Sequence, residues 1–324
     1  MPAFAQANQA LLDRFKAVMT EQGTAIAWQG EDSSTNDEGQ DVITLKDVTL
    51  TMSDQTVTLP SVDLVEPEQT DDGFTLARIA MPSYTYSQDE MSASITDATL
   101  DGVLLYKEGV ETPFGTPLWY DTMRIGEMRM QVKGKDVFTL TEASVSVDDP
   151  DGQTVDFSGG AEAFSVSLGE VEDPTTRAAV AAMGYETLDG YSEFAGSWDA
   201  ASGKLSLESF DLTGTDAGTL GLSFDIGGYT PDFIKSLGEL QAQMAAASEG
   251  TDNSAQGLAM LGLMQQLTFS GATISFTDDS LTAKVLDFVA KQQGQTPDAI
   301  KNQAKAVLPF MMMQLNNQEL TQMV

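Results

Sequence analysis

Apolar and polar residues alternate with a period of two along most of this chain. The alternation is clearest in residues 205–212 and again in residues 220–226, and the turn-forming residues Gly214, Asp216 and Gly218 separate the two runs. A period of two puts one side of a strand in water and the other side against apolar groups. The pattern therefore predicts two consecutive half-buried strands joined by a short turn.

Strands of the same kind are predicted throughout the first half of the chain. One run starts at Ile43 and Leu45, changes phase at Lys46-Asp47 and resumes at Val48, and such a change indicates a β-bulge that bends the strand. Turns rich in Asp and Gly separate the later runs, and connections this short favour an antiparallel meander over parallel crossovers. These later strands are predicted near residues 74–81, 92–106, 123–132, 137–147, 155–157 and 164–168.

Helical periodicity occurs at the start of the chain and in its second half. One amphipathic helix is predicted over residues 9–21. Asp173-Pro174 provides a favourable N-cap and first position for a helix that continues to about Leu188. Further helices are predicted at residues 230–244, 258–267, 280–293 and 297–316, with one strand at residues 268–276.

These elements together predict a β-rich α+β fold. We expect a long bent antiparallel sheet, or an open half-barrel, with helices packed on its apolar face. Residues 1–172 are predicted to form an antiparallel β-meander with an N-terminal helix. Residues 173–324 are predicted to form a mixed strand and helix region that continues the same sheet, so the two regions could also be one continuous domain.

Composition narrows the range of functions. The chain of 324 residues has 16 Lys and Arg against 49 Asp and Glu, and its net charge of −33 repels nucleic acid and anionic membrane surfaces. It contains no His and no Cys, which excludes imidazole and thiolate catalysis, metal sites built on those groups, and disulfides. This composition leaves carboxylate-based hydrolysis and an oxygen-ligated Ca²⁺ or Mg²⁺ site open. We nevertheless expect no enzymatic activity, no catalytic residue, no metal and no cofactor.

The start of the chain has features of a processed signal peptide. Ala3-Phe4-Ala5 and Ala5-Gln6-Ala7 both follow the small-x-small pattern of a cleavage site, and no apolar segment precedes them. We therefore expect a periplasmic protein, secreted across the inner membrane, whose signal peptide has been removed; an ordinary alanine-rich start is the alternative. No apolar run reaches the length of about 18 residues that would predict a transmembrane helix.

A repeated signature occupies the stretch around residues 199–222. It reads Asp199-x-x-x-Gly203-x-Leu205-x-Leu207 and then Gly214-x-Asp216-x-Gly218-x-Leu220-x-Leu222. This signature resembles the strand repeat of the AsmA-like and YdgA-like periplasmic proteins. The later segments 279–281, 290–294 and 308–309 are similar to the helical endings of that group, so the resemblance covers residues 190–324. It implies an envelope protein whose long curved sheet carries lipid or another apolar molecule, and it implies no catalytic residue.

The leading hypothesis is a soluble periplasmic binding or transfer protein for a lipid or another apolar small molecule, working with an envelope transport partner. The predicted sheet has more apolar area than one N-terminal helix covers, and a sheet of this length does not leave its apolar side in water. Sixteen methionines, whose flexible thioethers suit adaptable cavities, agree with this hypothesis. Side chains from the strands and the last helix are predicted to line the groove: Ile43, Leu45, Leu50, Met123, Met130, Leu222, Phe224, Met311 and Leu315.

The alternative hypothesis is an acidic scaffold or interaction protein of the bacterial envelope. In that case the sheet closes on its own core without a ligand, and the acidic surface faces a basic partner. Composition and periodicity leave both hypotheses open. A hollow in the apolar core would favour the first.

Overall fold

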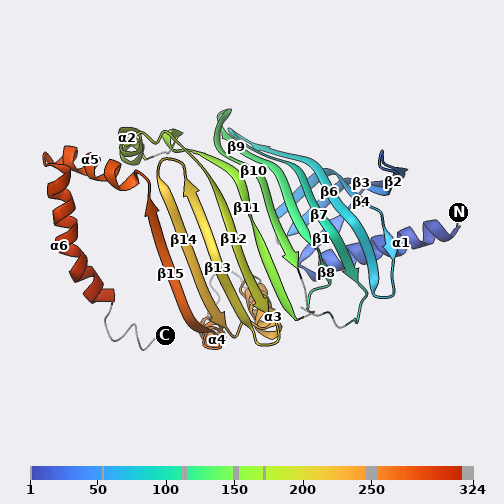
Figure 1. Cartoon of the computed structure of the whole chain (residues 1–324). Helices are drawn as coiled ribbons and strands as arrows, with labels where there is room; N and C mark the ends of the chain where they lie inside the picture. The colour runs from blue at the N-terminus through green and yellow to red at the C-terminus, as the bar shows by residue number, and fades with distance from the viewer. Residues whose placement is uncertain are drawn as a thin grey trace. The chain divides into compact units, whose positions relative to one another are not determined.

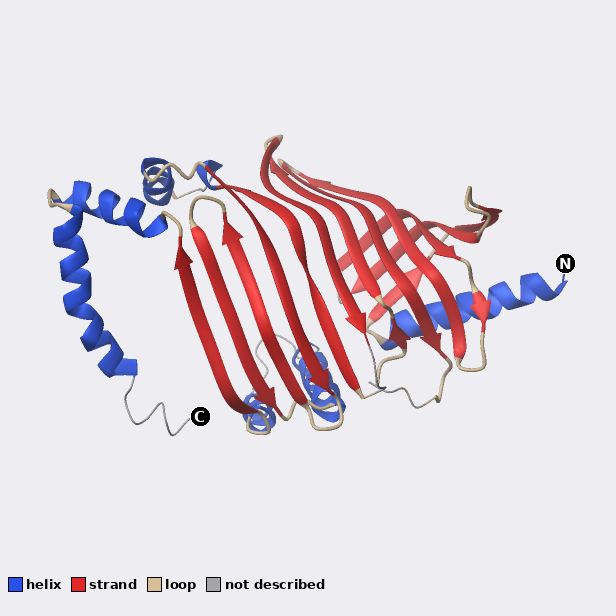
Figure 2. Ribbon diagram, in the orientation of Figure 1, coloured by secondary structure: helices blue, strands red, loops and turns tan. Residues whose placement is uncertain are grey.

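The computed structural model describes residues 2–52, 55–110, 112, 115–148, 153–170, 173–245 and 254–315. The chain is β-rich, and its strands form a large open antiparallel sheet (Figure 2). Two compact units divide the chain at Met1–Phe164 and Ser165–Val324, while the sequence pattern predicts a boundary at residue 172.

Unit 1 consists of a helix and a meander of long strands (Figure 1). Its strand order is β1-β3-β4-β6-β7-β9-β10-β11, with β2 added to β3, β5 to β6 and β8 to β7. Neighbours in the order are mostly neighbours in sequence, as the short turns predict. The elements are α1 (Pro2–Glu21), β1 (Thr24–Ala27), β2 (Gly30–Thr35), β3 (Asp41–Met52), β4 (Gln55–Val65), β5 (Glu68–Gln69), β6 (Gly73–Gln88), β7 (Met91–Tyr106), β8 (Leu118–Trp119), β9 (Thr122–Val132), β10 (Lys135–Asp148) and β11 (Thr154–Ser167).

The core of unit 1 lies between α1 and the apolar face of the sheet. One stripe of α1 is buried there, formed by Leu11, Leu12, Phe15 and Val18 at helical spacing. These side chains belong to one cluster with buried residues of β1, β3, β4, β6, β7 and β8. Arg14 anchors the polar side of the helix, because its Nε donates a hydrogen bond to the carbonyl oxygen of Tyr106 at the end of β7.

A line of unusual residues crosses the long strands of unit 1, and we call it the crease. Its members interrupt the ladder through a left-handed backbone, a missing amide hydrogen or a missing side chain. Asp47, Asp97 and Glu142 have φ angles of 50°, 52° and 48°. The register places these residues opposite prolines or a glycine in neighbouring strands. The crease consists of Asp47 and Pro60 on β3 and β4, and of Pro82, Asp97, Gly126 and Glu142 on β6, β7, β9 and β10.

The crease shifts the side-chain alternation without shifting the pairing register. Lys46 pairs with Ser61 and Val48 with Leu59, so each strand omits one residue at the same place. Leu45 and Val48, three residues apart, are therefore both fully buried in the same cluster. The predicted β-bulge at Lys46-Asp47 needs correction, because a bulge sets two residues opposite one. At the crease each residue lies opposite a single residue of the neighbouring strand, so the alternation of side chains changes at the same row in the paired strands.

Unit 2 contains four paired strands and most of the helices. Its strands follow the order β12-β13-β14-β15 in antiparallel pairs. The elements are a 3₁₀ turn at Leu168–Glu170, α2 (Pro174–Ala182), β12 (Thr187–Asp199), β13 (Lys204–Gly214), β14 (Gly218–Gly227), α3 (Pro231–Ala245), α4 (Ser254–Met264), β15 (Thr268–Asp278), α5 (Leu281–Gln293) and α6 (Pro297–Leu315).

The start of α2 follows the sequence prediction, whereas its end does not. The Asp173 side chain caps the helix by accepting hydrogen bonds from the Thr176 hydroxyl and amide, the latter at 2.7 Å. These bonds favour the carboxylate and lower the pKa of Asp173 below its ordinary value. The helix stops at Ala182 rather than near Leu188, because Gly184 takes a left-handed φ of 81° and β12 begins at Thr187.

The predicted cover of helices over the sheet of unit 2 is not confirmed. The alternation of β13, β14 and β15 places apolar residues in rows across the strands, for example Phe210, Leu222 and Ile274. Ile274 is 76% exposed, and every residue of β15 is exposed. The principal helix contacts of unit 2, in the described part of the chain, are α3 with α4 and α5 with α6. The helices thus pair with each other.

The close packing at the crease predicts that a side chain at Gly126 destabilises the protein. A Cβ atom at this position would lie 3.0 Å from the Cβ of Asp97 on the neighbouring strand. We expect Gly126→Val to lower the free energy of unfolding by about 1–3 kcal/mol, because the branched side chain overpacks the crease. Denaturant unfolding followed by circular dichroism measures this change.

Gly30→Val is the matched control, because no atom lies within 4 Å of the corresponding Cβ position on β2. It should change the free energy of unfolding by less than about 0.5 kcal/mol. Equal effects of the two substitutions would show that the packing at the crease has no special role.

Candidate functional site

An apolar pocket of about 300 Å³ lies in unit 1 between α1 and the sheet. Its walls come from α1, from the consecutive strands β1, β3, β4, β6, β7 and β9 of the sheet, and from β8, which pairs with β7. The apolar residues of the wall are Phe15, Met19, Ile26, Leu50, Leu59, Val62, Ile79, Met81, Ala98, Leu100, Leu118, Met123 and Ile125.

The crease positions the part of the wall that β4 supplies. Leu59 and Val62 flank Pro60 on β4, and both contribute to the pocket. In an unbroken strand, residues three apart point to opposite faces. The extra residue at the crease cancels that alternation, so both side chains face the same space.

The wall offers no charged side chain to a ligand. Thr99 and Arg124 border the pocket and lie opposite each other on β7 and β9. Their neighbours Leu100 and Met123 face the pocket, so strand alternation directs Thr99 and Arg124 to the other side of the sheet. Consistent with this, the Thr99 hydroxyl donates to Asp101 over 3.1 Å, and Asp101 also accepts from Arg78 Nε at 2.6 Å. The pocket can hold hydrocarbon but cannot neutralise a buried charge.

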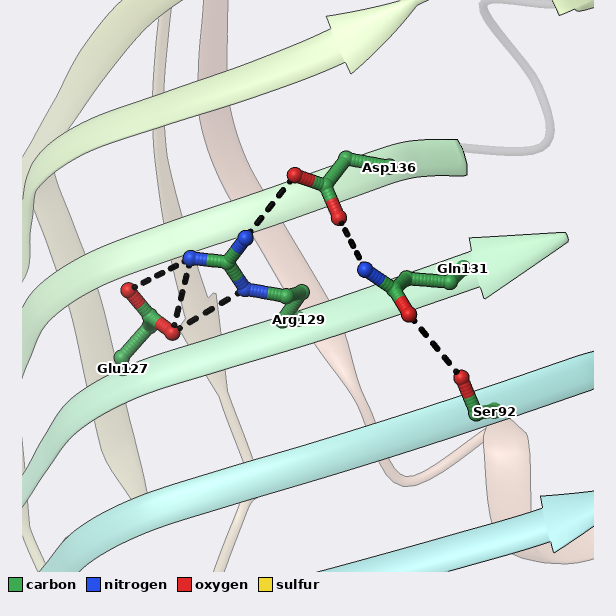
Figure 3. A network of polar contacts seen from close by, with 5 residues as sticks. All are labelled: Ser92, Glu127, Arg129, Gln131 and Asp136. Carbon is green, nitrogen blue, oxygen red and sulfur yellow. Dashed lines mark hydrogen bonds and ion pairs between the residues drawn. The ribbon is translucent and has the colours of Figure 1, made fainter. Parts of the chain in front are cut away.

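The opposite face of these strands carries a polar network (Figure 3). Arg129 donates to Glu127 at 3.2 Å and to Asp136 at 2.9 Å. Gln131 donates to the second oxygen of Asp136 at 2.7 Å and accepts from Ser92 at 3.3 Å. Glu127, through its hydrogen bonds, and Asp136, through its charge, raise the pKa of Arg129 above its ordinary value. The network bridges β7, β9 and β10 on the side that faces away from the pocket.

Two of the residues predicted from the sequence lie in the pocket wall. Leu50 of β3 and Met123 of β9 line it, and Met123 is 36% exposed at its edge. Ile43 and Leu45 have the same alternation but are buried in the core cluster, outside the wall. Met130 lies on β9 beyond the crease, where it is 37% exposed.

The remaining predicted residues belong to unit 2. Leu222 and Phe224 lie on β14, half-buried, on the apolar face of that unit. Met311 and Leu315 lie in α6, and their side chains are outside the described residues. The predicted residues are thus divided between the two units. Only Leu50 and Met123, both in unit 1, line the pocket.

Sequence reasoning missed most of the wall. Phe15 and Met19 follow the ordinary spacing of a buried helix stripe, and Ile79, Met81 and Leu100 follow the ordinary alternation of strands. Nothing in these local patterns separates a pocket residue from a core residue. The changes of phase on β4, β6, β7 and β9 were the available signal, since each one marks the crease beside the pocket.

The comparisons with known proteins give one match. A family model described as an uncharacterized protein matches residues 211–324, which lie in unit 2. No curated protein and no solved structure matches the chain.

The described residues were also searched for two other features. None of the helices in the described ranges is both long and apolar enough to cross a membrane. Over the same ranges, no group of three or more acidic side chains has the arrangement to hold a metal ion.

The exposure of the polar network predicts how much it contributes to the free energy of unfolding. Arg129 and its two carboxylate partners are partly exposed, and ion pairs of this kind contribute little to stability. We expect Arg129→Met to reduce the free energy of unfolding slightly at low salt and by less at high salt, because salt screens the pairs. Urea unfolding at two salt concentrations measures both values.

Arg129→Lys is the control that keeps the charge and loses the two-pronged contact with Glu127. It should fall between the native protein and Arg129→Met. A large loss of stability that salt does not change would instead assign the network to the core of the fold.

Proposed function

We propose that unit 1 binds a lipid or another apolar small molecule in the pocket between α1 and the sheet. The observation that carries this proposal is a partly open pocket of about 300 Å³ with apolar side chains on every wall element. Ligand pockets begin at about this volume and are lined mainly by apolar groups with few polar ones. A hydrocarbon chain matches the volume and the chemistry of these walls.

Imperfect packing without a ligand explains the pocket less well than ligand binding does. Protein interiors are packed as densely as organic crystals, and voids larger than a water molecule are few. Water in this partly open pocket finds no polar partner among the side chains of the wall, so an apolar occupant that displaces it gains free energy. The alternative of a closed acidic scaffold would not require a hollow at this place.

The biological setting of the proposal comes from the sequence. The resemblance of residues 190–324 to AsmA-like and YdgA-like proteins supports a periplasmic carrier, and we propose a lipid of the bacterial envelope as the ligand. The net charge of −33 keeps such a protein in solution and away from anionic membrane surfaces between encounters.

The test of this proposal is a variant that fills the pocket. Ala98→Trp places an indole in existing space, so the ligand should be lost while the thermal midpoint stays the same or rises. Lipid extraction and mass spectrometry of the purified protein, together with equilibrium dialysis against radiolabelled lauric acid, measure the occupancy. Binding should fall at least about tenfold, since the chain would lose the apolar contacts that hold it.

Thr96→Trp is the matched control on the same strand. Thr96 lies on the polar face of β7, so its substitution should leave binding within about twofold. The proposal is wrong if neither extraction nor dialysis finds an apolar compound on the native protein, or if Ala98→Trp binds as well as the native protein does.

A further inference from the structure

A second apolar surface lies beyond the crease on the face that also forms the pocket, and we call it the distal strip. Its members come from β6, β7 and β9, and cross-strand pairing sets them in rows. Tyr84 pairs with Ile95 and Ile95 with Met128 in the first row, and Tyr86 and Met130 both pair with Ala93 in the second. The distal strip consists of Tyr84, Tyr86, Met91, Ile95, Met128 and Met130.

The distal strip is exposed where it is farthest from the crease. Tyr86 is 48% exposed, Met91 53% and Met130 37%. Scattered apolar residues on a surface need no explanation, but here they adjoin one another on three paired strands. The exposure of these three side chains shows that this end of the sheet face is at least partly uncovered.

The pocket and the distal strip are continuous. The last row of the pocket wall is Met81, Ala98 and Ile125, which pair with one another across β6, β7 and β9. The next row on the same face is the first row of the distal strip, because the crease residues between them remove one step of alternation from each strand. Tyr84 accordingly packs against the same core cluster as Met81.

We propose that the bound hydrocarbon chain leaves the pocket past Ala98 and Ile125, crosses the crease and continues along the distal strip. This inference rests on the proposed function and adds the class of ligand: a long-chain fatty acyl compound. The pocket has room for about ten groups of the size of a water molecule or a methylene, so a longer chain must extend out of it. The uncovered methionines provide adaptable contacts for that extension.

The experiment compares chains of different length. Radiolabelled octanoic, lauric and palmitic acid, each below its micelle concentration, are dialysed against the native protein and two variants. Affinity should rise about twofold to fourfold for each methylene that reaches the distal strip. Met130→Glu should lower the affinity for palmitic acid at least about tenfold and leave octanoic acid within about twofold, because the new carboxylate lies beside the outer part of the chain alone.

Ser94→Glu is the control, since it adds the same charge to the polar face of β7 and should change neither affinity. Met91→Glu, on the neighbouring strand, repeats the test if Met130→Glu does not give a native circular dichroism spectrum. Sedimentation velocity without ligand shows whether a second copy of the chain covers the distal strip instead.

The outcomes separate this inference from the proposed function. Loss of palmitic acid binding alone in Met130→Glu supports the extended path. Equal binding of octanoic and palmitic acid by all proteins overturns the extended path and leaves the pocket standing. Absence of binding by every acid overturns both. A dimer that Met130→Glu dissociates, with no effect on the acids, assigns the distal strip to self-association and overturns the inference.

Discussion

The shared change of phase at the crease is the constraint on which the structure of unit 1 depends. A strand that alone gained a residue would turn all its later side chains to the other face. Because Asp97 faces Pro82 on one side and Gly126 on the other, the three strands change phase at one row. The apolar face therefore continues through the interruption, and the pocket wall, the core cluster and the polar network each remain on one side of the sheet.

Most of the secondary structure of this chain could be predicted from local patterns. Alternation located the strands, and Asp173-Pro174 located the start of α2. The end of that helix was missed because Gly184 ends it while the apolar spacing continues to Leu188. The change in alternation at Asp47 was visible in the sequence, but the backbone feature that causes it could not be predicted. A bulge and a crease give the same pattern in one strand, and only the pairing with Pro60 distinguishes them.

The candidate site could be predicted only in part, for a physical reason. Alternation determines the face on which a side chain lies, but not its position relative to a helix far away in sequence. Leu45 and Leu50 share the apolar face of β3, yet Leu45 is buried in the core cluster and Leu50 borders the pocket. Phe15 and Met19 come close to them through tertiary packing alone. Such long-range contacts leave no local signature.

The apolar wall of the pocket links ligand binding to folding. The pocket is partly open, and Met123 in its wall is 36% exposed, so water reaches the apolar wall when nothing else is bound. Apolar surface in contact with water costs roughly 25 cal/mol per Å². The proposed apolar ligand would remove this surface from water and, by binding the folded state alone, would stabilise that state by mass action. Under that proposal the ligand completes the apolar packing between α1 and the sheet.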